Sequence, residues 1–121
     1  MDINKIGRNL LLSKIIENST FTERQIQIIY KVYNKEKKPA DISAGAYYRQ
    51  IKQCKDKIRK IHYSFIILSL VGLLDNESII ALKSIVQKVN SLDNNISEIN
   101  HGKDIDNVIN IINLIINKIS L

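Results

Sequence analysis

The sequence predicts an all-α fold, and three observations carry this prediction. The chain has 121 residues, of which 45% are hydrophobic and 25% are charged, as in one foldable soluble domain. It has one Pro and four Gly, so the turns that a β-sandwich or barrel requires are mostly absent. Apolar residues recur at steps of three and four along most of the chain, which is the spacing of amphipathic helices.

Two helices are predicted before residue 34. Apolar residues at helical spacing predict the first over residues 3–18. Thr20 or Thr22 then offers an N-cap for the second helix. The apolar stripe of this second helix consists of Ile26, Ile29, Tyr30 and Tyr33. The polar run that ends at Pro39 breaks it.

A long helix is predicted over residues 46–73, with Ser43 as an N-cap before it. Its apolar residues alternate at steps of four and three, as in a heptad seam: Tyr47, Ile51, Cys54, Ile58, Ile61, Phe65 and Leu68. One continuous helix would be roughly 40 Å long, and a bend at His62 into two helices is the alternative. The first half carries charges away from the seam, whereas the second half is apolar on all faces. We expect this second half to be buried, in the centre of the fold or between two copies.

Two further helices complete the predicted helical bundle. Asp75 or Asn76 caps the first of them, whose apolar positions run to Leu92 and whose end leads into a polar loop at residues 93–95. The second, over residues 104–121, directs one face inward: Ile105, Val108, Ile109, Ile112, Ile115, Ile116 and Ile119. We expect residues 75–121 to form a packing and dimerisation region. Residues 1–74, which end with the long helix, would form one continuous domain with this region.

The positive charge is concentrated in the middle of the chain. Eighteen Lys and Arg against twelve Asp and Glu give a net charge of +6, yet residues 31–60 alone carry +7. Such a field predicts an anionic partner, nucleic acid first and a membrane surface second. The alternative is that these lysines are solvated on a helix surface and bind no partner.

Residues that could carry catalysis are few. Cys54 lies on the apolar seam, where a buried, unreactive thiol is expected, and a single Cys forms no internal disulfide. Neither His62 nor His101 has a Cys, Asp or Glu at metal-ligand spacing, and the isolated glycines form no phosphate loop. We therefore expect a protein that is not an enzyme and binds no metal or cofactor.

Nothing in the sequence predicts secretion or membrane insertion. The start of the chain lacks the pattern of a signal peptide. The longest apolar run, Tyr63 to Leu74, has 12 residues, short of the ~20 that span a bilayer. A cytoplasmic protein is expected.

Two segments resemble a known DNA-binding motif. Phe21-Thr22-Glu23-Arg24-Gln25, followed by the run from Ile42 to Ile51 (ISAGAYYRQI), resembles the helix-turn-helix of LuxR-type regulators and the related sigma-factor domain. The resemblance covers residues 21–58. Its middle helix is shortened to a turn around residues 39–42, so the chain looks closer to small archaeal helix-turn-helix proteins. The resemblance implies that the start of the long helix is a recognition helix.

Candidate nucleic-acid contacts fall into two groups. Residues at the start of the recognition helix, after the cap Ser43, would face base edges or the adjacent backbone: Ala44, Ala46, Tyr47, Tyr48, Arg49, Gln50 and Gln53. Tyr47 also begins the apolar seam, and Tyr48 could instead cap the core. Lysines would hold phosphates without reading sequence: Lys35, Lys37, Lys38, Lys52, Lys55, Lys57 and Lys60.

Three functions fit these observations. The leading one is a protein that binds double-stranded DNA, as a transcriptional regulator or chromatin factor, and forms a homodimer through residues 61–74 and 104–121. The alternative is a non-catalytic accessory subunit or interaction module of a nucleic-acid-processing complex. A peripheral membrane binder is the weakest of the three because the chain has no Trp and few Phe anchors.

Overall fold

The computed structural model describes residues 10–93 and 102–121, and within them the chain is helical with no strand. The all-α prediction is confirmed. The helices are α1 (Leu10–Glu17), α2 (Glu23–Tyr33), α3 (Ala44–Val71), α4 (Asn76–Asp93) and α6 (Gly102–Ile119). Three predicted features lie outside the described residues: the first part of the helix predicted over residues 3–18, namely residues 3–9, the end of the polar loop at residues 94–95, and His101.

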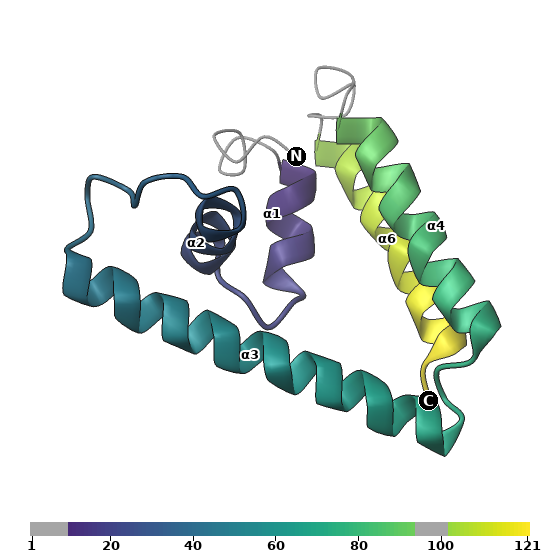
Figure 1. Cartoon of the computed structure of the whole chain (residues 1–121). Helices are drawn as coiled ribbons and strands as arrows, with labels where there is room; N and C mark the ends of the chain where they lie inside the picture. Colours follow the sequence, from purple (N-terminus) through teal and green to yellow (C-terminus); the bar gives the residue numbers. More distant parts are fainter. Residues whose placement is uncertain (1–9, 94–101) are drawn as a thin grey trace.

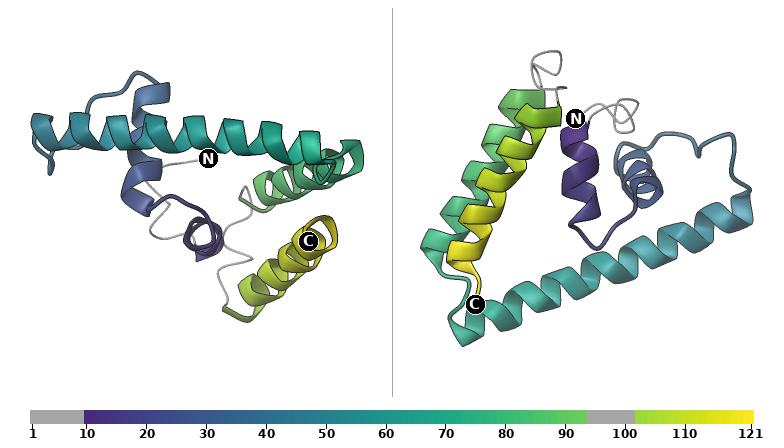
Figure 2. Two further views of the ribbon diagram at one scale, coloured as in Figure 1. Left: turned by 90° about the horizontal axis from the view of Figure 1, so that it is seen from below. Right: turned by 180° about the vertical axis from the view of Figure 1, so that it is seen from behind.

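The helices form an open arrangement (Figure 1). The long helix α3 runs along one side, and α2 packs across its first half. The helices α4 and α6 lie side by side and antiparallel, rising from the far end of α3, and α1 contacts α6 (Figure 2). The predicted bundle is therefore incomplete within one chain.

Helix α2 begins with a capping box. Thr22 Oγ1 accepts from the backbone N–H of Gln25 at 3.1 Å, and Gln25 Oε1 accepts from the backbone N–H of Thr22 at 3.1 Å. This reciprocal pair satisfies two of the free N–H groups at the helix start. Of the two caps the sequence offered, the structure uses Thr22.

The predicted stripe of α2 is partly wrong. Ile28, which lies outside that stripe, is fully buried, whereas Tyr33 is 85% exposed. The physical reason is that α2 is covered from two sides. Ile26 and Tyr30 pack against Ile16 of α1, and the Ile28 side faces α3. The buried surface is therefore wider than one stripe, and it ends before the last residue of the helix.

Helix α2 ends in a left-handed residue that is not glycine. Lys35 has φ 56°. Its N–H donates to the carbonyl of Val32 at 3.2 Å, and the N–H of Glu36 donates to the carbonyl of Lys31 at 2.8 Å. These two bonds make a Schellman motif, in which glycine is the usual left-handed residue.

We expect Lys35→Gly to stabilise the fold. A side chain in the left-handed region costs about 1–2 kcal/mol, part of which glycine loses again through its greater freedom in the unfolded chain. The net gain should be about 0.5–1 kcal/mol, measured by urea denaturation. Lys37→Gly in the same loop is the control, because Lys37 has no positive φ, and it should not stabilise. A Lys35→Gly protein no more stable than the wild type would contradict this account.

Helix α3 is one continuous helix of 28 residues, so there is no break at His62. It begins at the predicted cap, where Ser43 Oγ accepts from the N–H of Ala46 at 3.2 Å. It ends at Gly72, which has φ 95°, and Leu73 N–H closes the turn on the carbonyl of Leu68 at 3.0 Å. At 1.5 Å per residue its length is about 42 Å.

The apolar second half of α3 is not buried in the centre of the fold, and that expectation is wrong for the single chain. Phe65 is 44% exposed, Ile67 55% and Leu70 77%. The reason is the open arrangement, because α2 covers only the first half of α3. Within that first half Tyr47 and Cys54 are buried, as predicted for the seam.

The C-terminal helices agree with the sequence pattern except at Ile116, which was predicted to face inward and is 38% exposed, because α1 and α4 cover only part of α6. Asp75 caps α4, since its Oδ1 accepts from the N–H of Ser78 at 2.8 Å. On α6 the inward face is anchored by Ile105, which is 2% exposed. No helix in the described part of the chain combines the length and the hydropathy needed to cross a membrane.

Candidate nucleic-acid interface

The first half of α3 presents a basic face opposite the buried seam. Residues three and four apart lie on one side of a helix. The exposed side chains therefore form two adjacent rows, Tyr48, Lys52, Lys55 and Arg59 in one and Arg49, Gln53, Asp56 and Lys60 in the other. The five cations against one carboxylate give this surface, which we name the α3 basic face, a net charge of +4.

Among the described residues, no carboxylate forms an ion pair with the cations of the α3 basic face. The ion pairs within residues 10–93 and 102–121 are Lys14 with Glu17 and Arg24 with Asp41. None of them involves α3. Positive charge that is exposed and unpaired on one helix face is what a phosphate backbone requires.

Two of the predicted phosphate ligands are already occupied. Lys57 Nζ donates to the carbonyl of Thr20 at 2.6 Å and to Gln25 Oε1 at 2.8 Å, and it lies 5.8 Å from the centre of the Phe21 ring. Lys38 Nζ donates to the carbonyl of Ile42 at 2.8 Å. Lys57 thus joins the start of α2 to α3, and we leave it out of the interface. Lys35 and Lys37 are exposed but lie in the loop before α3.

The predicted base-contacting residues divide between the two sides of α3. Tyr47 is 9% exposed and belongs to the core. Gln50 is half-buried, and its Oε1 is buried with no hydrogen-bond partner among the described residues. Tyr48, at 70% exposure, and the exposed Arg49 and Gln53 point outward. Ala46 is half-buried, and the exposed Ser43 and Ala44 lie at the start of the helix.

The loop between α2 and α3 is held by a contact that the sequence analysis did not find. The Arg24 guanidinium makes two hydrogen bonds with the carboxylate of Asp41, across 17 positions of the chain. Residues 34–43 contain no helix, in agreement with the turn predicted around residues 39–42. The Arg24–Asp41 pair therefore links α2 to the segment that leads into α3.

The pKa values of two aspartates are lowered in the folded protein. The hydrogen bond from Arg24 lowers the pKa of Asp41 below its ordinary 3.8, and the backbone N–H of Ser78 lowers the pKa of Asp75 below the same value. A carboxyl whose folded pKa is lowered stabilises the fold above its unfolded pKa, and the contribution is lost as the pH falls through the folded pKa.

We therefore expect Asp41→Asn and Asp75→Asn to destabilise the protein at pH 7 but to match the wild type at low pH. Urea denaturation between pH 7 and about pH 2 measures the difference. Asp56→Asn is the control, because Asp56 is exposed and has no ion-pair partner in the described part of the chain. A difference that stays constant over this pH range would refute the assignment.

No metal centre is found in the residues that the structure describes. Cys54 is 3% exposed, and burial raises the pKa of its thiol, which agrees with the predicted packed cysteine. No group of three or more His, Cys, Asp or Glu in the described segments could hold a metal ion.

Comparison of the chain with protein-family models, with curated proteins and with solved structures finds no match. The case for a function consequently rests on the geometry of the helices themselves.

Proposed function

We propose that the protein binds double-stranded DNA through the α3 basic face, as a transcriptional regulator or chromatin factor. The observation that carries the proposal is a set of five exposed cations on one side of one helix, none of which has an ion-pair partner within residues 10–93 and 102–121: Arg49, Lys52, Lys55, Arg59 and Lys60. An α-helix fits the major groove of B-DNA, and cations along its exposed side reach the flanking phosphates.

Within this face we assign different roles to the two ends. Arg49 and Gln53 lie near the start of α3, the part of a recognition helix that meets base edges, and Arg and Gln pair with guanine and adenine respectively. Lys52, Lys55, Arg59 and Lys60 supply contacts to phosphates. Tyr48 stands beside them and offers an exposed ring.

The binding unit in this proposal is a homodimer, with residues 61–74 and 104–121 at its interface. Two copies related by a two-fold axis would carry two basic faces and so address two half-sites. Among the predicted interface residues, Leu70 on α3 and Ile111 on α6 are more than 50% exposed.

Fluorescence anisotropy with a labelled duplex over a salt series tests the proposal. The affinity should fall steeply as salt rises, because each phosphate contact releases counterions. Affinity that is independent of salt, or no binding at low salt, would count against it. A matched single-stranded RNA, measured in parallel, shows whether the partner is duplex DNA.

A non-catalytic accessory subunit is the second candidate. The observation that favours it is the exposed apolar half of α3, which could dock on a different protein. A chain that stays monomeric by light scattering and does not bind duplex DNA would favour this candidate over the first.

A further inference from the structure

The second half of α3 is largely exposed in the described part of the single chain. No charged residue occurs between Tyr63 and Leu74. Exposure is not confined to one side, because the seam residues Ile61 and Phe65 are 41% and 44% exposed, and Val71 is 72% exposed. An apolar helix of this kind needs a concave apolar partner.

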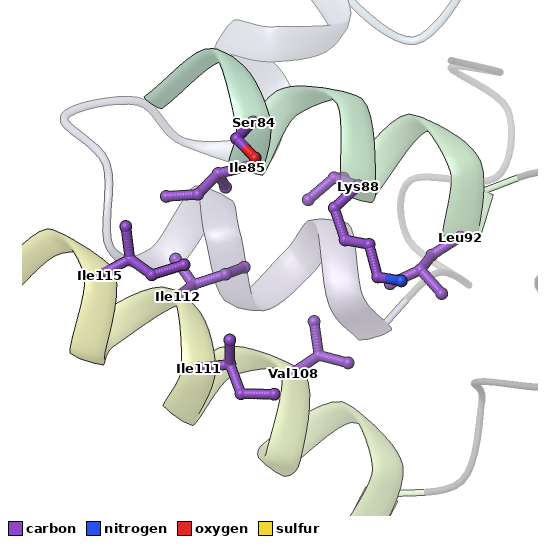
Figure 3. Close-up of a pocket in the computed structure, with 9 residues that line it drawn as sticks. Ser84, Ile85, Lys88, Leu92, Val108, Ile111, Ile112 and Ile115 are labelled. Atoms are coloured by element: carbon purple, nitrogen blue, oxygen red, sulfur yellow. The ribbon is translucent and has the colours of Figure 1, made fainter. Parts of the chain in front are cut away.

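A concave apolar surface lies elsewhere in the same chain. A groove of about 280 Å³ runs between α4 and α6, and apart from Ser84 and Lys88 every residue that lines it is aliphatic. Figure 3 shows side chains of the two helices meeting across it, among them Ile85, Ile112 and Ile115. The 18 residues of each helix span about 27 Å, longer than the roughly 16 Å of α3 from residue 61 to 71.

The two surfaces do not meet within one chain. Helices α3 and α4 are joined by residues 72–75, and they diverge from this short connection (Figures 1 and 2). The apolar half of α3 therefore lies along one arm of the molecule, and the α4–α6 groove lies along the other.

The exposed surface is large enough for a stable dimer. The whole chain, including the residues outside the described ranges, exposes 8876 Å², whereas a compact monomer of 13.9 kDa exposes about 6,700 Å². Two copies that covered this excess of about 2,200 Å² on each chain would bury about 4,400 Å², an area in the range of obligate homodimers.

We infer that a second copy of the chain covers both surfaces by reciprocal exchange, with the apolar half of α3 from each copy seated in the α4–α6 groove of the other. Two-fold symmetry provides this arrangement directly, since each copy carries one helix and one groove. The inference rests on the homodimer proposed above. It is independent of DNA binding and is tested without DNA.

Light scattering on the free protein gives the first test. The wild type should have twice the monomer mass of 13.9 kDa. Leu70→Glu on the helix and Ile111→Glu in the groove should each raise the dissociation constant by on the order of 100-fold, because each places a charge in an apolar contact. Leu114→Glu is the matched control. Leu114 is as exposed as Ile111 on the same helix but does not line the groove, so this variant should remain a dimer.

Mixing the two variants separates reciprocal exchange from other dimers. A Leu70→Glu chain keeps an intact groove, and an Ile111→Glu chain keeps an intact helix. Their heterodimer therefore has one undamaged contact, and mixing should restore association that neither variant shows alone. Circular dichroism of each variant confirms that the helices are retained.

Three results would overturn the inference. They are a monomeric wild type, an Ile111→Glu protein that dimerises like Leu114→Glu, and a mixture that fails to associate. A monomeric wild type that floats with phospholipid vesicles would show that a membrane covers these surfaces instead. A chain that folds α3 against its own groove would be a compact monomer and would therefore give the first of these results, a monomeric wild type.

Discussion

Replacing Lys52 and Arg59 together by Gln should lower the affinity for duplex DNA about 30-fold at low salt and flatten its salt dependence. Both side chains lie in the same exposed row of α3, and neither has an ion-pair partner in the described residues. Each phosphate contact contributes about 0.9 to the slope of log K against log salt, so the slope should become shallower by about 1.8. Gln has a helix propensity close to that of Lys and Arg, so α3 should remain folded.

The control removes the same net charge from another part of the protein. Lys83→Gln with Lys118→Gln also neutralises two exposed lysines, one on α4 and one on α6. This pair should leave the slope and the affinity close to those of the wild type. If both double variants lose affinity equally, binding depends on the net charge of the protein and not on the α3 basic face.

Sequence preference should separate from affinity along α3. Arg49→Ala should reduce the discrimination between a preferred and a mismatched duplex, whereas Lys52→Gln should weaken both duplexes alike. Equal losses on both duplexes for Arg49→Ala would place Arg49 among the phosphate contacts.

Lys57→Met should destabilise the fold by about 1.5–3 kcal/mol, the net value of hydrogen bonds to a charged group. The ammonium of Lys57 bonds the carbonyl of Thr20 and the buried Gln25 side chain, so its removal detaches the start of α2 from α3. Methionine keeps a stem of similar length, so the loss reports the ammonium rather than packing. Urea denaturation measures the difference.

Lys55→Met serves as the control for this change. Lys55 is two residues earlier on α3 and is exposed on the basic face. We expect it to weaken DNA binding with little change in stability, the reverse of Lys57→Met. Should Lys57→Met weaken DNA binding while its stability stays that of the wild type, Lys57 belongs to the interface after all.

The helices could be predicted from the sequence because local signals specify them. Thr22, Ser43 and Asp75 act as caps where their side chains can accept from the following N–H groups, and Gly72 ends α3 where a left-handed residue is needed. The extent of α3 follows from the same signals. These effects act within four residues along the chain, so the sequence states them directly.

The tertiary arrangement could not be predicted in the same way. The seam of α3 repeats unchanged from Tyr47 to Leu68, yet it is buried only where α2 crosses it. Periodicity shows that a face is apolar and does not show which element covers it.

The candidate site was predicted in part for a related reason. Lys55 and Lys57 are the same residue type and lie two positions apart in the sequence. The ammonium of Lys57 nevertheless bonds Gln25, whereas Lys55 is exposed to solvent. The Thr22-x-x-Gln25 spacing is a capping-box signal that could have identified Gln25. No local signal links Arg24 to Asp41 or Lys57 to Thr20, because these contacts depend on how the loops fold back.

The absence of a break in α3 fixes the rotational phase between its two halves. A rigid α-helix turns by about 100° per residue, so inserting one residue after Lys60 would rotate the cationic side by that angle relative to the apolar end. Inserting seven residues would nearly restore the original orientation of the two sides. The continuous helix thus sets both the distance and the rotation angle between its two ends. In the proposed dimer, the contacts at the far end of α3 would therefore set the direction in which its near end approaches DNA.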